Sequence, residues 1–224
     1  MSSNDKTVFH MIILTSIFVA SLLSAQIIAG IKIANIMGFI LPAGFLAYAI
    51  TFPITDIVDE VYGKKYAVYI VWSGFIANIV LLALVFLGYI MPPLAPEMQS
   101  IYEKALVPVG RIVVASMIAY LVSQHHDVWA FLKWREITGG KHLWIRNNFS
   151  TIVSQGIDTI LFISIAFMGV VPNNILLQMI LYQWMWKVII ALADTPFVYI
   201  GVTILKGGIN LGNQVTTRPL LHEP

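Results

Sequence analysis

Residues 66–90 read YAVYIVWSGFIANIVLLALVFLGYI, and this stretch, which contains no Asp, Glu, Lys or Arg, decides the fold class. A helix of this length crosses a membrane, because the hydrocarbon core is about 30 Å thick and each helical residue rises about 1.5 Å. The chain as a whole is also strongly apolar: 58% of its 224 residues are hydrophobic, 11% are charged and the mean hydropathy is +0.84. Soluble domains carry roughly a quarter charged residues, so the sequence predicts an integral membrane protein.

Other apolar stretches extend this prediction to an all-α membrane protein, a bundle of about six transmembrane helices in a single domain over residues 1–224. The predicted spans are 8–30, 36–58, 66–90, 109–131, 147–171 and 175–205. Lys32 and turn-forming runs of Gly, Pro and Asn separate them. We expect no cleavable signal peptide, because the first apolar stretch is itself long enough to span. Ala25 and Ala29 form a small-xxx-small pair, which permits close helix packing.

Proline interrupts two of the predicted spans. The 31 residues of 175–205 would reach about 46 Å as a straight helix, which is longer than the membrane requires. Pro196 is expected to kink or break that span, and Pro53 the second span, because proline removes a hydrogen-bond donor and clashes with the preceding turn. Interrupted helices in transporters often mark binding sites, although a simple kink without a ligand role explains each proline equally well.

The basic residues predict the orientation of the chain in the cytoplasmic membrane. With the N-terminus inside, the cytoplasmic segments contain nine of them: Lys6, Lys64, Lys65, Lys133, Arg135, Lys141, Arg146, Lys206 and Arg218. The external loops contain Lys32 and Lys104, with Arg111 at the outer start of the fourth span. Cytoplasmic loops carry an excess of Lys and Arg, so both termini are expected to be cytoplasmic.

Three charged residues lie deep within the last two predicted spans, where each costs at least about 2.5–3.5 kcal/mol to insert. Asp158 lies near the middle of the fifth span and Lys187 near the middle of the sixth, which runs the opposite way, so we expect similar depths. Asp194 follows Lys187 by seven residues and shares its face. A structural Asp–Lys pair accounts for part of this pattern, and the additional acid favours a polar binding site.

Further polar residues extend the candidate site. Asn148 and Gln155 recur with Asp158 at helical spacing and form a polar stripe that must face the protein interior. Asp56 lies three residues after Pro53, deeper in the membrane than Asp59 and Glu60 at the cytoplasmic end of the second span. Arg111 is either a snorkelling residue at the outer interface or the cationic wall of an outer vestibule.

Several other functions find no support in the sequence. Cysteine is absent, which excludes disulfides, thiolate metal sites and cysteine nucleophiles. There is no Walker A, HExxH or GxSxG motif, so neither ATP hydrolysis nor common hydrolytic chemistry is encoded. We therefore expect no enzyme activity, no cofactor and no metal, and the net charge of +2 is too small to suggest nucleic acid. The expected partners are a small molecule and the lipid bilayer, and the chain is free to be a homo-oligomer.

Four segments carry a family resemblance. They are Phe52–Asp56 with Glu60–Gly63; Arg111 through 116–120 to Asp127; 144–151 through to Asp158, Thr159 and Phe162; and Lys187 through to 194–197. In this order and spacing, over about residues 40–205, they resemble the queuosine precursor transporter family, formerly labelled "putative vitamin uptake transporter". The resemblance implies uptake of 7-deazaguanine bases (preQ0 or preQ1) for tRNA modification. It also implies a six-helix arrangement similar to the substrate-binding subunits of energy-coupling-factor transporters.

The resemblance also suggests roles for the candidate residues. Asp158 or Asp194 is expected to accept the N1–H and exocyclic amine of a guanine-type edge, while Lys187 donates to the carbonyl. Asn148 and Gln155 could serve the remaining edge, and Trp184, Phe52 or Phe162 could stack on the ring, which is worth about 1–3 kcal/mol. The alternative function is the substrate-binding subunit of an ATPase-coupled vitamin or nucleobase importer.

Overall fold

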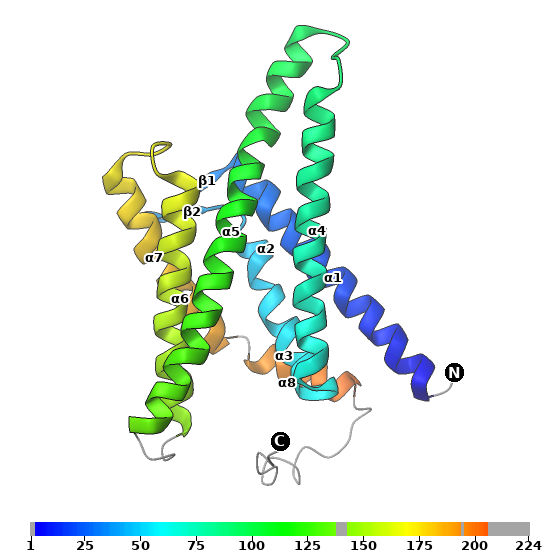
Figure 1. The fold of residues 1–224 in the computed structure, drawn as a ribbon, viewed down its shortest axis with the longest axis vertical. Helices are drawn as coiled ribbons and strands as arrows, with labels where there is room; N and C mark the ends of the chain where they lie inside the picture. The colour runs from blue at the N-terminus through cyan, green and yellow to red at the C-terminus, as the bar shows by residue number, and fades with distance from the viewer. Residues whose placement is uncertain (1–2, 138–142, 194, 206–224) are drawn as a thin grey trace.

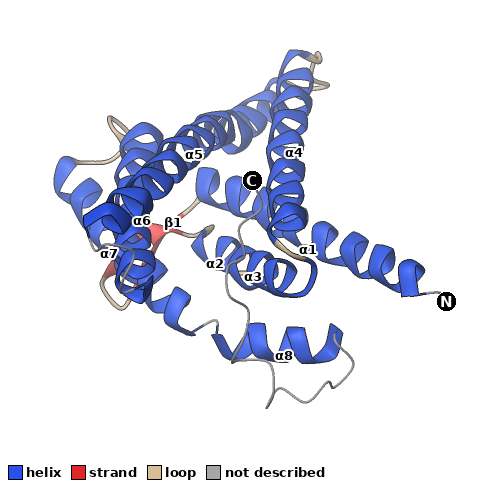
Figure 2. Ribbon diagram, turned by 60° about the horizontal axis from the view of Figure 1, so that its bottom comes forward, coloured by secondary structure: helices blue, strands red, loops and turns tan. Residues whose placement is uncertain are grey.

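The computed structural model describes residues 3–137, 143–193 and 195–205, and within them the chain is almost entirely helical (Figures 1 and 2). The elements in chain order are α1 (Ser3–Ile31), β1 (Ile33–Ile36), β2 (Phe39–Pro42), α2 (Phe45–Ala49), α3 (Thr51–Tyr62), α4 (Lys64–Ile90), α5 (Pro96–Ile137), α6 (Leu143–Phe167), α7 (Asn173–Ala193) and α8 (Thr195–Leu205).

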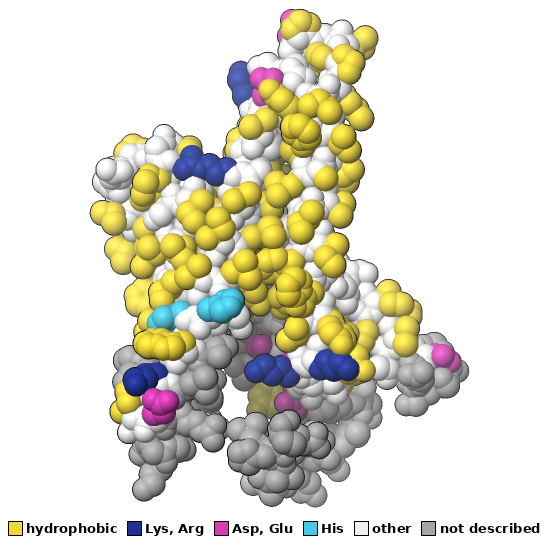
Figure 3. Space-filling model, in the orientation of Figure 1, with side chains coloured by type: hydrophobic (Ala, Val, Ile, Leu, Met, Phe, Trp, Pro, Cys, Tyr) yellow, Lys and Arg dark blue, Asp and Glu magenta, His cyan; other side chains and the backbone are white. Residues whose placement is uncertain are grey.

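Three segments of the described helices are long and apolar enough to cross a membrane: Asp5–Ile31, Lys64–Ile90 and Pro96–Asp127. The uncharged stretch 66–90 lies within α4, whose outward face exposes large apolar side chains such as Ile76, Leu84 and Phe86, each about 60% exposed. Hydrophobic side chains cover most of the face shown in Figure 3. Apolar surface of this extent requires lipid rather than water around it, which confirms the membrane class.

The prediction of a membrane helix over 36–58 is wrong for the first part of that range. Residues 33–42 form an antiparallel hairpin in which Ile33 pairs with Pro42 and Ile36 with Phe39. The two-residue turn places Met37 and Gly38 at φ of 52° and 92°, the positive values that tight hairpin turns require. Hydropathy does not separate such a hairpin from the start of a membrane helix, since both are short apolar runs.

Both predicted interruptions occur, and in each case the new helix begins just before the proline. Pro53 is the third residue of α3 and Pro196 the second residue of α8. The first turn of a helix tolerates proline, because the N–H groups there have no partner within the helix. Figure 2 shows α8 turned away from α7. It packs instead on α3, where Ile57 closely approaches Gly201.

Helix α5 is longer than the predicted span 109–131. Its 42 residues include Pro108 and most of the segment 91–108, which was expected to be an external loop. At about 1.5 Å per residue it reaches about 63 Å, twice the hydrocarbon thickness. The extra turns of α5 pack against the end of α4, and the two helix ends project together from the rest of the molecule (Figure 1). There the Tyr102 hydroxyl donates a hydrogen bond to the Val85 carbonyl at 2.8 Å.

Two apolar clusters hold the elements together. One joins α1, α5, α6 and α7: Ala29, Ile112, Ala115, Ile163, Ala166, Phe167, Leu176 and Met179. The other joins α1, α3 and α4: Phe18, Leu22, Ile54, Val58 and Ile70. Helix α1 contributes to both clusters.

Gly44 brings the start of α2 against α1. A Cβ atom at this position would lie 2.1 Å from the Ala25 carbonyl oxygen and 3.0 Å from the Ala29 Cβ. The φ of Gly44 is −65°, which any residue adopts, so close approach alone requires glycine. The small-xxx-small pair formed by Ala25 and Ala29 thus receives a backbone segment, as its spacing predicted.

We expect Gly44→Ala to destabilise the protein by about 1–3 kcal/mol, because the added methyl group has no space and must displace α2 from α1. The matched control is Gly110→Ala in α5, where a Cβ would meet nothing closer than Leu82 at 3.8 Å. Thermal unfolding of the purified proteins in detergent measures the effect. Equal Tm values for the two variants would contradict the close-packing argument.

Candidate functional site

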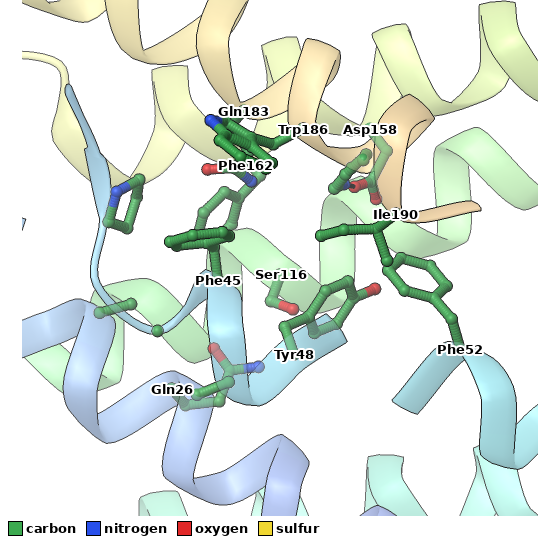
Figure 4. A pocket seen from close by; sticks show the side chains of 15 residues that line it. Gln26, Phe45, Tyr48, Phe52, Ser116, Asp158, Phe162, Gln183, Trp186 and Ile190 are labelled. Carbon is green, nitrogen blue, oxygen red and sulfur yellow. Dashed lines mark hydrogen bonds and ion pairs between the residues drawn. The ribbon is translucent and has the colours of Figure 1, made fainter. Parts of the chain in front are cut away.

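A cavity of about 640 Å³, its opening included, lies between the hairpin and helices α1, α2, α3, α5, α6 and α7 (Figure 4). It is lined by Ala25, Gln26, Ala29, Pro42, Gly44, Phe45, Tyr48, Phe52, Ser116, Asp158, Phe162, Gln183, Trp186, Lys187 and Ile190. The walls are mainly aromatic and aliphatic, with a few convergent polar groups, which is the usual construction of a small-molecule site.

The charged group of the cavity is an ion pair between α6 and α7. The Lys187 ammonium donates to Asp158 Oδ2, and both residues are buried, at 6% and 8% exposure. Ser123 of α5 donates from Oγ to Asp158 Oδ1 at 3.4 Å. The ammonium also lies 5.6 Å from the centre of the Tyr48 ring, within the range of a cation–π contact. Each charge therefore has partners within the protein.

A buried pair of this kind is costly to disturb. Removing one partner leaves an uncompensated charge, which typically costs about 3–5 kcal/mol, whereas replacing both with apolar groups is often neutral. The pair is therefore weak evidence for stability. Its place on a cavity wall makes both charges accessible to a small molecule that offers polar groups of its own.

Two amides add polar groups to the walls. Gln183 is one turn from Lys187 on α7 and is 7% exposed, and its Oε1 has no hydrogen-bond partner among the described residues. Buried acceptors are rarely left unpaired, because desolvation without a hydrogen bond costs about 1–3 kcal/mol. Gln26 of α1 is 3% exposed and lines the opposite wall. The Gln183 acceptor thus indicates a place for a donor from a ligand.

Aromatic rings form the flat walls. Tyr48 and Phe52 lie edge to face at 5.3 Å between ring centres, and Phe45 lies 6.1 Å from Trp186. Phe162 approaches from α6, one turn beyond Asp158. Figure 4 shows these rings pointing into the same space as Ser116 and Gln26. A flat heterocycle fits such walls, with its polar edge directed to the charged pair and the amides.

The structure gathers four of the ten candidate residues at the cavity: Asp158, Lys187, Phe52 and Phe162. Four others lie elsewhere: Asp56, Gln155, Trp184 and Arg111. Asn148 belongs to α6 but its side chain, like the whole of Asp194, lies outside the described residues. The proposed roles of those two residues stay predictions.

The residues placed elsewhere have visible structural positions. Trp184 donates its indole N–H to the Ile152 carbonyl at 3.1 Å, on the outer side of α6. Arg111 donates to the carbonyls of Ile165 and Met168, both at 2.6 Å. Cations favour helix C-termini, so Arg111 joins α5 to the end of α6, a role that neither predicted alternative described. Asp56 lies in a separate groove.

Helical spacing identifies a ring that the sequence reasoning missed. Gln183, Trp186, Lys187 and Ile190 follow the i, i+3, i+4, i+7 pattern of one face, and all four line the cavity. Trp184 is one residue from Gln183, about 100° around the helix, and points away. The spacing from Lys187 therefore favours Trp186 as the stacking residue of α7.

Among the described residues, no group of three or more His, Cys, Asp or Glu side chains is placed to hold a metal ion. The cavity instead presents one carboxylate, one ammonium, two amides and two hydroxyl groups, those of Tyr48 and Ser116, within aromatic walls. This set can bind and orient a flat molecule with hydrogen-bonding edges.

The sequence of the chain is similar to those of known transporters. The model of the family described as "Putative vitamin uptake transporter" matches residues 42–201, which include the cavity-lining elements from α2 to α7. The chain is also 30% identical over 172 residues to the "Probable queuosine precursor transporter" of Bacillus subtilis (strain 168), an alignment covering 75% of each protein. No solved structure matches the chain significantly. The chain therefore belongs to the "putative vitamin uptake transporter" family, whose members are membrane transporters and not enzymes.

Proposed function

We propose that the protein imports 7-deazaguanine bases, preQ0 or preQ1, across the cytoplasmic membrane for tRNA modification. The observation that carries this proposal is the buried Asp158–Lys187 pair on the wall of an aromatic cavity. The name of the Bacillus relative, a queuosine precursor transporter, supports the same substrate class.

The polar groups of the cavity match the edge of a guanine-type base. Such an edge offers an N1–H and an exocyclic amine side by side, and the Asp158 carboxylate can accept both. Lys187 can then move from Asp158 to the base carbonyl, which exchanges one charge-assisted hydrogen bond for another. The Gln183 acceptor can take a remaining donor. A site of this kind rejects analogues that lack these groups, because its own polar atoms would be left unpaired.

The rings of Phe52, Phe162 and Trp186 provide the stacking surfaces, and each base–aromatic contact is worth about 1–3 kcal/mol. The amide of Gln155 does not line the cavity, so we no longer assign it a contact with the base.

We further propose six membrane crossings with both termini in the cytoplasm, in an arrangement similar to energy-coupling-factor binding subunits. The adjacent Lys64 and Lys65 at the start of α4 support this orientation, since basic residues gather on the cytoplasmic side. In this orientation the end of the cavity next to the β1–β2 hairpin faces outward, and the α3–α4 junction faces the cytoplasm.

Titration of purified protein with preQ0, guanine and riboflavin tests the substrate class. We expect preQ0 to bind more tightly than guanine, and riboflavin to bind least, because the bulkier flavin ring lacks a guanine-type edge. Uptake by the purified protein alone in proteoliposomes would identify a self-sufficient carrier. Binding without uptake, restored by a partner ATPase, would instead support the ATPase-coupled alternative. Tighter binding of riboflavin than of preQ0 would overturn the proposal.

Replacing either member of the ion pair should strongly reduce transport. We expect Asp158→Asn and Lys187→Met each to reduce preQ0 uptake by about tenfold or more, since removing one contact to the base costs about 1–3 kcal/mol and leaves the other charge unpaired. Uptake is compared at equal amounts of membrane-inserted protein.

The double variant Asp158→Asn/Lys187→Met separates a binding role from a structural one. It leaves no unpaired charge, so we expect its stability to recover towards that of the unmodified protein. Uptake should stay at least as low as in the single variants, because both contacts to the base are gone. Recovery of uptake together with stability would show that the pair serves the fold alone.

Gln183→Leu should weaken preQ0 binding by roughly 5- to 150-fold, which corresponds to about 1–3 kcal/mol. Its Tm should not fall, because the Oε1 atom that it removes has no partner among the described residues. The matched control is Asn78→Leu in α4. The Asn78 Oδ1 is likewise buried and without a partner in the described chain, but the residue does not line the cavity. Equal affinities for the two variants would exclude Gln183 from the site.

A further inference from the structure

A second hollow lies next to the cavity, between α3, α4 and α5. This groove, of about 940 Å³ with its opening included, is lined by Thr55, Asp56, Asp59, Lys64, Ala67, Val68, Val71, Trp72, Phe75, Tyr120, Leu121 and Gln124. Neither the ion pair nor the amides of the cavity belong to it. Its position explains why Asp56, a candidate for the substrate site, does not reach Asp158.

The groove continues the cavity along two helices. On α3, Phe52 lines the cavity and Asp56, four residues later, lines the groove. On α5, Ser116 lines the cavity and Tyr120, again four residues later, lines the groove. Four residues are about 6 Å of helix, so the two hollows lie end to end with one helical turn between them.

Three rings form the partition. Tyr48 and Phe52 are in edge contact on the cavity side, and Tyr120 lies on the groove side with its ring 5.3 Å from Phe75. The Asp158 carboxylate interacts electrostatically with the hydroxyl groups of both Tyr48 and Tyr120. The rings of Tyr48, Phe52 and Tyr120 therefore lie between the two hollows, near the charged pair.

We propose that this groove is a second chamber of the transport path, which receives the base when it leaves the cavity past Phe52 and Tyr120. This inference rests on the proposed function. In the proposed orientation the groove lies on the cytoplasmic side of the cavity, because Lys64 at the start of α4 is part of its lining.

The lining of the groove suits a flat base in transit. Trp72 lies 5.8 Å from Phe75, which in turn contacts Tyr120, so a row of three rings leads away from the partition. Rings of this kind stack on a base without demanding a particular edge. Asp56, Asp59 and Gln124 add acceptors at the groove walls. The base can thus leave the charged pair without losing all of its contacts.

Helix α3 carries the Phe52 ring of the partition. It is a separate segment of 12 residues, bounded by Ile50 after α2 and by Gly63 before α4. Gly63 has a φ of 93°, a value that residues with a Cβ rarely adopt. A small tilt of α3 about these two ends moves Phe52 relative to Tyr120, which belongs to the long helix α5.

The absence of native cysteine allows a direct test. Thr55→Cys and Gln124→Cys place a single thiol on each side of the groove, on α3 and α5. Ser73→Cys is the matched control, since Ser73 lies about 180° around α4 from Lys64 and does not line the groove. Each purified variant is modified with a bulky maleimide, verified by its mass, and compared with its own unmodified form for preQ0 binding and for uptake in proteoliposomes.

We expect the adduct at Thr55→Cys or Gln124→Cys to lower uptake by about tenfold or more while preQ0 still binds with nearly unchanged affinity. The adduct at Ser73→Cys should alter neither. Uptake that is unaffected by both groove adducts, or preQ0 binding that is lost together with uptake, would overturn the second chamber. A complete lack of preQ0 binding and uptake in the unmodified variants and the native protein would overturn the proposed function itself, and the inference with it.

Discussion

Asp158 and Lys187 belong to neighbouring helices of opposite direction, and their pairing determines the relative height of α6 and α7. A slide of one helix by a single turn would separate the charges by about 5.4 Å and leave both unpaired, at a cost on the order of 3–5 kcal/mol. The apolar contacts around them lose much less from such a slide, because other apolar side chains replace those that leave. The pair therefore fixes the level at which Gln183 of α7 and Phe162 of α6 meet in one cavity.

The opposite side of the cavity is built from short elements. The hairpin, α2 and α3 occupy a stretch in which one membrane span, interrupted at Pro53, was expected, and backbone groups at membrane depth must find partners within the protein. The hairpin meets this requirement through its own ladder and through the bond from Ala43 N–H to the Lys32 carbonyl at 2.9 Å. Packing of α3 on α8 and of Gly44 on α1 then positions Phe52 and Tyr48. One wall of the cavity is therefore built from long helices, and the opposite wall is built from short segments.

Sequence reasoning reached the parts of this arrangement that depend on depth and composition. The similar depth of Asp158 and Lys187 followed from counting residues along spans of opposite direction, and the structure pairs the two side chains. It failed where partners come from other elements, as for Arg111, whose acceptors lie 54 and 57 residues away. Hydropathy likewise could not distinguish the hairpin from a helix. Trp186, by contrast, was accessible to a stricter use of helical spacing, since its face is the face of Lys187.

A transporter has to release what it binds, and in the function that we propose the internal pair contributes to the release of the base. Any contact that the base makes with Asp158 replaces a contact with Lys187, so the net gain is smaller than the gross strength of the new hydrogen bonds. When the base departs, the pair forms again, and neither charge is left bare in the low-dielectric interior. The proposed site therefore assigns recognition and release to the same two residues: the pair would select a polar edge, and its own re-formation would limit how tightly that edge is held. This balance requires an adjacent place for the departing base, which is the role that we propose for the aromatic groove beyond Tyr120.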